Sequence, residues 1–305
     1  MHWGGGLTRS PAASWTLPER VKGYVALTKP RIVELLLVTT VPTMFVASSH
    51  MPSARLVLLT LTGGSLAAGG ANALNMVYDR DIDAKMERTK RRPLVTGVMT
   101  PTAATVFALS LEVAAFAILW RTVNLLSATL AVSATAFYVG VYTVWLKRSS
   151  SQNIVIGGAA GAVPALVGWS AVTGRLSWAP LCMFGLVFLW TPPHFWALAV
   201  RYRDDYTRAD VPMLPSVVGM RSVTHQILLY TLALFALSLL LAPVAHLGPL
   251  YLCVAILLGI GFVGQALALR RDPSARRAMK LFAYSITYLG TLFVSMGVDA
   301  LIRHS

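Results

Sequence analysis

Long apolar segments alternate with short polar ones along almost the whole chain. A helix that crosses a bilayer needs about 20 apolar residues, and nine of these segments have roughly that length. The pattern therefore predicts an all-α polytopic membrane protein. We expect its nine transmembrane helices near residues 30–49, 55–78, 101–120, 123–145, 153–173, 177–200, 223–245, 247–269 and 281–301.

The N-terminal residues 1–20 differ from the rest, because Gly, Ser and Pro interrupt any continuous apolar core. We predict a mobile tail over residues 1–20, rather than a cleaved signal peptide, followed by a single transmembrane domain over residues 21–305.

The composition agrees with a membrane protein. Of 305 residues, 56% are hydrophobic and 12% are charged, and the mean hydropathy is +0.64. A net charge of +14 could indicate nucleic-acid binding, but the basic residues lie in loops between apolar segments, where they orient a membrane protein. We therefore expect contact with a lipid bilayer and no nucleic-acid partner.

The basic residues also predict the orientation. Of the 26 Lys and Arg residues, all but four fall in segments on one side of the predicted helices; the exceptions are Arg55, Arg121, Arg175 and Arg303. Cytoplasmic loops carry the excess of Lys and Arg. We predict a bacterial-type inner or plasma membrane location, with a cytoplasmic N-terminus, cytoplasmic polar loops and an external C-terminus.

The stretch 75–92 departs most from the apolar pattern, with four acidic and six basic residues. Asn75, Asp79 and Asp83 are four residues apart, so on a helix their side chains share one face. Carboxylates that close repel one another, and Mg²⁺, which prefers oxygen ligands and commonly holds a phosphate as well, resolves the repulsion. The spacing predicts a Mg²⁺ site at Asp79 and Asp83, with Asn75 beside them.

Basic residues near this face suit the remaining charge of a phosphate. They are Arg88, Lys90, Arg91 and Arg92 just downstream, and Lys29 and Arg31 at the entrance to the first helix. A topology-determining loop would also explain basic residues here, but it would not explain three polar residues at helical spacing.

A second polar stretch follows the sixth apolar segment, just as the first follows the second segment. This offset of four helices suggests two pseudo-repeated four-helix halves plus one helix, with the two polar stretches facing each other. Asp204 and Asp205 are adjacent, so on a helix they point about 100° apart and only one can face the site squarely.

Several motifs resemble one family. The pattern Asn75-x-x-x-Asp79-x-x-x-Asp83 resembles the first diphosphate-binding motif of the UbiA superfamily of intramembrane prenyltransferases. Five further stretches, in order, resemble the heme-farnesylating branch of that superfamily: Leu27–Val33, Tyr142–Lys147, Gln152–Gly158, Trp190–Leu198, and the segment from Asp205 to Pro215. The resemblance extends over residues 22–300.

The resemblance implies a UbiA-like bundle that transfers farnesyl from farnesyl diphosphate to a vinyl group of heme b, with addition of water, giving heme O and diphosphate. Heme b is then a substrate and Mg²⁺ the cofactor. An aromatic or quinone-precursor acceptor is the alternative within the superfamily. A transporter is the alternative outside it, but a transporter would place its polar residues near the bilayer midplane. The implied downstream partner is a heme A synthase or an oxidase-assembly protein.

The resemblance also assigns candidate roles. The candidate catalytic residues are Asn75, Asp79, Asp83, Asp204 and Asp205. Many relatives carry D-x-x-x-D in the second loop, where this chain has Tyr202 and Tyr206 at the outer positions, so the number of Mg²⁺ ions stays open.

Aromatic faces can stabilise the allylic carbocation that farnesyl transfer creates. The candidates are Tyr78, Tyr142, Tyr202 and Tyr206, and ordinary interfacial tyrosines are the alternative. Lys147, at the end of the stretch that begins with Tyr142, completes the candidate substrate-binding residues together with His194.

His225, near the start of the seventh predicted helix, is the second candidate contact for the heme iron, and His194 is the first. His194 follows Trp190-Thr-Pro-Pro, which we expect to break the sixth helix and open space there. The alternative is a histidine hydrogen-bonded to a carbonyl that the prolines leave free.

Overall fold

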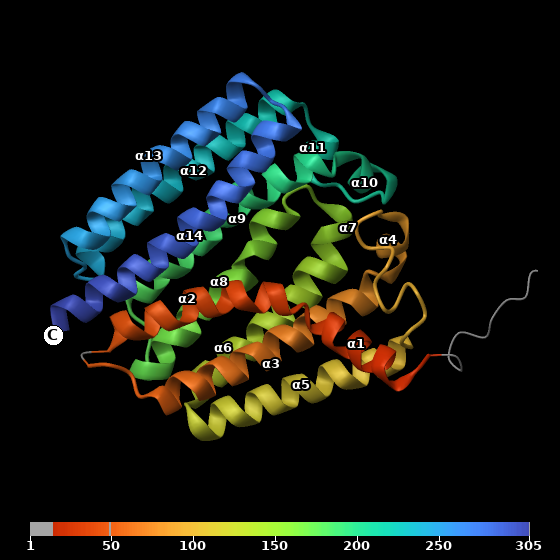
Figure 1. The fold of residues 1–305 in the computed structure, drawn as a ribbon, viewed down its shortest axis with the longest axis horizontal. Helices are drawn as coiled ribbons and strands as arrows, with labels where there is room; N and C mark the ends of the chain where they lie inside the picture. The colour runs from red at the N-terminus through yellow and green to blue at the C-terminus, as the bar shows by residue number, and fades with distance from the viewer. Residues whose placement is uncertain (1–14, 49, 305) are drawn as a thin grey trace, which may run out of the picture.

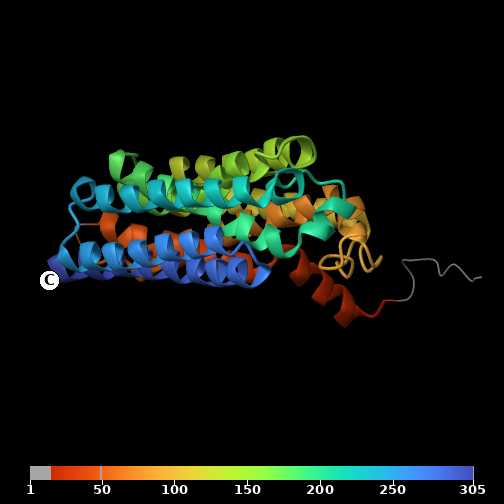
Figure 2. The same ribbon diagram turned by 90° about the horizontal axis from the view of Figure 1, so that it is seen from above.

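The computed structural model describes residues 15–48 and 50–304, without the side chains of residues 31–37 and 304. Within these residues every regular element is a helix, and the long helices pack side by side in one bundle (Figure 1, Figure 2). The all-helical fold predicted from the apolar pattern is therefore confirmed.

The long helices are α2 (Pro30–Ala47), α3 (Ala54–Tyr78), α5 (Pro101–Thr122), α6 (Leu125–Ala136) with its continuations η1 (Phe137–Leu146) and α7 (Lys147–Ser149), α8 (Asn153–Thr173), α9 (Trp178–Arg201), α12 (Met220–Val244), α13 (Pro249–Arg271) and α14 (Ala275–His304). The short helices are α1 (Leu17–Thr28), α4 (Arg80–Lys85), α10 (Arg203–Arg208) and α11 (Leu214–Val217).

Among the described residues, eight helices are long and apolar enough to cross a membrane. Of α2, only Val38–Ala47 is assessed for membrane crossing, and this part is a shorter apolar helix. The multi-pass architecture is confirmed, whereas a count of nine spans stays a prediction. The division into two repeated four-helix halves stays a prediction as well.

The bundle is closed by its last helix. Along the chain, α3 packs against α5, α8 against α9, and α12 against both α9 and α13. Helix α14 then packs against α13, α9 and α2, and so joins the end of the chain to its beginning. The largest apolar core lies where α9, α12, α13 and α14 meet, around fully buried side chains such as Trp196, Tyr288 and Phe262.

Both polar stretches lie at the same end of the bundle. Helix α4 follows α3, and α10 and α11 follow α9, so the short helices gather on the right of Figure 1, opposite the end of α14. Lys85 of the first stretch pairs with Asp210 of the second at 3.3 Å. We call this end of the molecule the polar end.

Helix α1 begins earlier than the composition suggested. The backbone N–H and the hydroxyl of Thr16 both donate to the Glu19 carboxylate at 2.8 Å, and Pro18 lies in the first turn, where its missing N–H costs nothing. The last residues of the predicted tail are therefore helical. Residues 1–14 of that tail lie outside the described part of the chain.

The prediction that the Pro192–Pro193 pair breaks the sixth predicted helix is wrong, because α9 runs through both prolines. Membrane helices tolerate proline where side chains and neighbouring helices satisfy the freed backbone groups. The hydroxyl of Thr191 donates to the carbonyl of Val187 at 2.8 Å, which adds a hydrogen bond one turn before the prolines.

Helices α8 and α2 approach closely at Gly168. A Cβ at this position would lie 2.5 Å from the backbone oxygen of Thr40, and a backbone atom cannot move aside as a side chain can. Glycine is therefore the residue that lets these two helices meet, as small residues commonly do at helix contacts in membranes.

We expect Gly168→Ala to destabilise the folded protein by about 1–3 kcal/mol, the usual range for overpacking. Gly161→Ala, on the same helix, is the matched control, because a Cβ at Gly161 meets nothing within 4 Å. The measurement is the melting temperature of both variants in detergent. Equal melting temperatures would contradict the close contact.

Candidate active site

Two carboxylates are buried at the polar end. Asp79 ends α3 and is 0% exposed, and Asp83 lies in α4 and is 2% exposed. Asn75, one turn before Asp79, is 3% exposed. The backbone N–H of Asp79 donates to the Asn75 carbonyl, and that of Asp83 donates to the Asp79 carbonyl, so the four-residue repeat continues across the junction between the helices. All three polar side chains are thereby brought into the protein.

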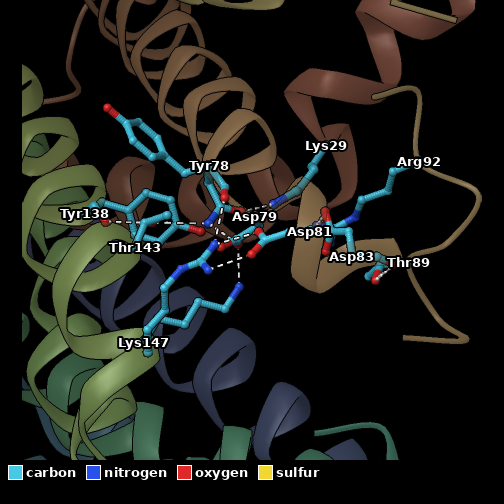
Figure 3. A network of polar contacts seen from close by, with 12 residues as sticks. Lys29, Tyr78, Asp79, Asp81, Asp83, Thr89, Arg92, Tyr138, Thr143 and Lys147 are labelled. Atoms are coloured by element: carbon cyan, nitrogen blue, oxygen red, sulfur yellow. Dashed lines mark hydrogen bonds and ion pairs between the residues drawn. The ribbon is translucent and has the colours of Figure 1, made fainter. Parts of the chain in front are cut away.

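Each buried carboxylate has a basic partner from another segment (Figure 3). Lys147, at the start of α7, pairs with Asp79. Arg92, from the loop after α4, donates to Asp83 at 2.6 Å. Buried charges need such partners, because an unpaired charge inside a protein is strongly destabilising.

The amide of Asn75 is fully used by neighbouring side chains. Its Nδ2 donates to Asp79 at 2.7 Å and to Thr143 at 3.1 Å, and its Oδ1 accepts from the Nζ of Lys29 at 3.0 Å. Asn75 therefore links α3 to η1 and to the junction between α1 and α2. Lys29 occupies that junction in a left-handed conformation with φ 49°.

One oxygen of this network remains without a partner. The Oδ1 of Asp79 is buried and accepts no hydrogen bond. Within the described residues, no group of three or more His, Cys, Asp and Glu side chains comes together. Asp79 and Asp83 therefore fit Mg²⁺ as a pair of ligands, because this ion keeps several waters and is commonly held by one or two carboxylates plus substrate phosphates.

Three basic side chains converge on the two acids. Burial, and after it the nearby charges of Arg92 and Lys147, lower the pKa of Lys29 to about 7 against the opposing influence of Asp79 and Asp83. Three basic groups thus lie near only two carboxylates. The site therefore suits an anion.

Arg148 holds the outer rim of the site. Its guanidinium donates two hydrogen bonds to Asp81, each at 2.7 Å, and one to the carbonyl of Tyr78 at 2.8 Å. Hydrogen bonding to Arg148 lowers the pKa of Asp81 to about 2. The sequence analysis did not identify Arg148, Asp81 or Thr143 as site residues. The motif Tyr142–Lys147 could have pointed to two of them, because Thr143 lies within it and Arg148 follows it directly.

Of the four loop bases, only Arg92 contacts the buried acids. Arg88 lies over the ring of Tyr202, with its Cζ 5.7 Å from the ring centroid. Lys90 pairs with Glu87 on the surface, and Arg91 is exposed. The side chain of Arg31 lies outside the described residues.

The second polar stretch separates its two aspartates. Asp205 is buried and accepts from Arg208 at 3.0 Å, whereas Asp204 is exposed. Tyr206 is 7% exposed, and burial raises the pKa of its hydroxyl, although the charge of Arg88 partly offsets the increase. Arg88 thus interacts with both Tyr202 and Tyr206 and connects the two stretches.

Tyr142 faces the interior from η1. Its ring stacks on that of Tyr138, with centroids 5.3 Å apart, and it fits against Gly157 of α8, where a Cβ would lie 2.3 Å from the ring. Aromatic surface is therefore concentrated next to the acidic network.

His194 lies deeper, within α9 and 8% exposed. Its ring stacks between Trp190 and Phe282, with centroid distances of 4.1 and 4.5 Å. The hydrogen-bond partner of its Nδ1 is the hydroxyl of Ser285, at 2.7 Å, and not a carbonyl freed by the prolines. That alternative is therefore wrong.

The hydrogen bonds of Ser285 fix the tautomer of His194. The Ser285 hydroxyl gives its single proton to the carbonyl of Phe282 at 2.6 Å, so it can only accept from the imidazole. His194 therefore carries its proton on Nδ1, and its Nε2 keeps a free lone pair. An imidazole oriented in this way by a partner on its other nitrogen is typical of metal ligands.

Comparison with known proteins places the chain in a family. Residues 36–294 match the UbiA prenyltransferase family. Protoheme IX farnesyltransferase of Streptomyces avermitilis is 51% identical over 290 residues, covering 93% of this chain and 95% of that protein. The protein of the same name from Gloeobacter violaceus is 49% identical, covering 97% of each chain.

Solved structures of low sequence identity share the fold. A structure of digeranylgeranylglyceryl phosphate synthase is similar with a TM-score of 0.77 and 18% identity, covering 93% of this chain and 99% of that one. A UbiA homologue from Archaeoglobus fulgidus, bound to GPP and Mg²⁺, has a TM-score of 0.65 and 16% identity, covering 92% of this chain and 99% of the other. The resemblance of the motifs is thus confirmed, and the chain belongs to the UbiA prenyltransferase family.

Proposed function

We propose that this protein converts heme b to heme O by transferring farnesyl from farnesyl diphosphate to a heme vinyl group. The observation that carries the proposal is the buried pair Asp79 and Asp83, with one free carboxylate oxygen, beside the basic side chains of Lys29, Arg92 and Lys147. Relatives about 50% identical over nearly the whole chain bear the name protoheme IX farnesyltransferase, which supports this choice of acceptor.

The donor reaction begins with cleavage of the allylic C–O bond, which leaves negative charge on diphosphate. Mg²⁺ held by Asp79 and Asp83 supplies electrostatic stabilisation of that charge when it is bound. Lys29, Arg92 and Lys147 lie beside the carboxylates, where they bind the diphosphate oxygens and stabilise the leaving group. Positioned charges of this kind are effective because they need no reorganisation during the reaction.

The farnesyl cation then requires a dry, electron-rich surface. The stacked rings of Tyr138 and Tyr142 and the buried ring of Tyr206 provide it through cation–π attraction. The vinyl carbon attacks the cation to form the new C–C bond, and water adds to the cation left on the porphyrin side chain with loss of a proton. The products are heme O, diphosphate and that proton.

The acceptor side centres on His194. Its unprotonated Nε2 is suited to ligate or orient the heme iron, because Ser285 holds the other ring nitrogen. His194 precedes Tyr202 by eight residues, so at 1.5 Å per residue it lies roughly 12 Å deeper along α9. Heme bound there extends from the core toward the polar end.

The basic residues support a cytoplasmic polar end in a bacterial-type inner or plasma membrane, with the end of α14 outside. Heme O formed there passes on to a later heme-modifying step, so a heme A synthase or oxidase-assembly protein stays the predicted partner.

The decisive experiment incubates membranes containing the protein with heme b, farnesyl diphosphate and Mg²⁺, and detects heme O by mass. We expect Asp79→Ala and Asp83→Ala each to lower the rate by about 10²–10³, because each removes a group that stabilises the leaving diphosphate. Chelation of Mg²⁺ should stop turnover. Asp272→Asn, which changes an exposed acid of the loop after α13, is the control and should leave the rate unchanged.

The same assay with an aromatic or quinone-precursor acceptor tests the alternative substrate. Prenylation of that acceptor without heme O would overturn the choice of heme. Full turnover of both aspartate variants would remove the acidic pair from the mechanism.

We expect His194→Ala to weaken heme b binding and shift the heme absorption band, while affinity for a farnesyl diphosphate analogue changes little. Ser285→Ala should weaken heme binding less, because it removes only the group that orients the imidazole. Titration of both ligands into detergent-purified variants measures these effects. Unchanged heme affinity in a folded His194→Ala protein would exclude His194 from the acceptor site.

The pKa of Lys29 predicts a pH dependence of donor binding. In the empty site this pKa is about 7, and a bound diphosphate raises it by adding negative charge, so binding takes up a proton. Affinity should therefore be constant below pH 7 and fall above it, by at most about tenfold per pH unit. Calorimetry with a non-reacting farnesyl diphosphate analogue between pH 6 and 9 measures the slope.

Lys29→Met is the control for this titration. The variant should bind the analogue more weakly and lose the part of the slope that belongs to Lys29. An identical slope in both proteins would show that another group titrates.

A further inference from the structure

The fourth helical span changes its winding beside the active site. Between α6 and α7, residues Phe137–Leu146 form the π-helix η1, 10 residues long. In a π-helix the hydrogen bonds join residues five apart instead of four, and such segments are rare, usually short, and frequent at functional sites. This length of π-helix therefore requires a reason.

The contact between Tyr138 and Thr143 follows this winding. Tyr138 and Thr143 are five residues apart, and the Thr143 hydroxyl bonds to the backbone carbonyl of Tyr138 (Figure 3). In an α-helix, residues five apart point roughly 140° away from each other. From the same span Thr143 reaches Asn75, and Lys147, the first residue after η1, reaches Asp79 (Figure 3).

Thr143 itself is completely buried. Its hydroxyl donates to the carbonyl of Tyr138, five residues earlier, at 2.9 Å. Because a hydroxyl has one proton, the Thr143 oxygen can then only accept from Asn75. The amide of Asn75 must therefore turn its Nδ2 toward Thr143 and its Oδ1 toward Lys29.

This orientation determines how Asp79 is held. The second proton of the Asn75 Nδ2 goes to the Oδ2 of Asp79 at 2.7 Å, which leaves the buried Oδ1 without a partner. A chain of hydrogen bonds thus runs from the backbone of η1 through Thr143 and Asn75 to the carboxylate.

We propose that Thr143 is a positioning residue of the donor site, and that the π-helical winding of η1 exists to place it against Asn75. The inference rests on the proposed cation and diphosphate site at Asp79 and Asp83. Thr143 touches neither ligand; it fixes the amide that fixes the carboxylate. Groups that orient metal ligands in this way are commonly worth 10–100-fold in metal affinity.

The test measures binding of Mn²⁺ as a probe for Mg²⁺, together with inorganic diphosphate, by electron paramagnetic resonance of the purified full chain. Thr143→Val keeps the shape of the side chain and removes the hydroxyl, so we expect the dissociation constant for Mn²⁺ to rise about 10–100-fold. Thr143→Ser keeps the hydroxyl and should bind within about threefold of the unchanged protein. Thr143→Ala serves the same comparison if the valine variant does not fold.

A purely structural role predicts another outcome. The Val and Ala variants would then melt at a lower temperature but bind Mn²⁺ as tightly as the unchanged protein, and that result overturns the proposal. Failure of the Ser variant to restore binding overturns it as well. Asp79→Ala distinguishes a failure of the proposed donor site from a failure of the role of Thr143. If Asp79→Ala binds Mn²⁺ as tightly as the unchanged protein, the donor site itself is misplaced. If Asp79→Ala loses Mn²⁺ affinity while Thr143→Val keeps it, only the role of Thr143 is refuted.

Discussion

The burial of two carboxylates at one end of an apolar bundle is the constraint on which the rest of the polar end depends. A buried charge without a partner is strongly destabilising, and the desolvation of an ion pair is offset only when its geometry is good. Asp79 and Asp83 therefore require Lys147 and Arg92, which come from the start of α7 and from the loop after α4. The acids thus hold this loop and the junction between η1 and α7 against the end of α3.

The charges of this network suit the binding role that we propose for it. Lys29, Arg92 and Lys147 supply one more positive charge than Asp79 and Asp83 supply negative charge when Lys29 is protonated. The pKa of Lys29 is lowered first by its burial and then by the charges of Arg92 and Lys147. A divalent cation at the free Asp79 oxygen increases the excess. Only a polyanion such as a diphosphate ester restores the balance, so cation and anion each favour binding of the other. The site is organised in advance for both.

The sequence predicts the helices well because the membrane leaves few alternatives: every backbone group must be satisfied within its own segment. It also locates the acids, because their four-residue spacing is local. It does not reveal partners from distant segments, such as Ser285 for His194 or Thr143 for Asn75, since no periodicity connects those positions. An apolar run looks the same whether it is wound as an α-helix or a π-helix. The two prolines suggested a break, but α9 runs through them and packs against α8, α12 and α14.

Helix α8 joins the proposed donor side of the molecule to the proposed acceptor side through two adjacent glycines. At Gly157 a Cβ would lie 2.3 Å from the ring of Tyr142 in η1, and at Gly158 it would lie 2.9 Å from the side chain of Thr191 in α9. Successive residues of a helix point about 100° apart, so one short segment of α8 admits a neighbour on each of two sides. The same turn of α8 therefore sets the depth of the stacked tyrosines and, through the unbroken α9, the depth of His194. The distance between the diphosphate network and the imidazole is thus a property of backbone packing, which explains why a continuous α9 is needed where two prolines would otherwise allow a hinge.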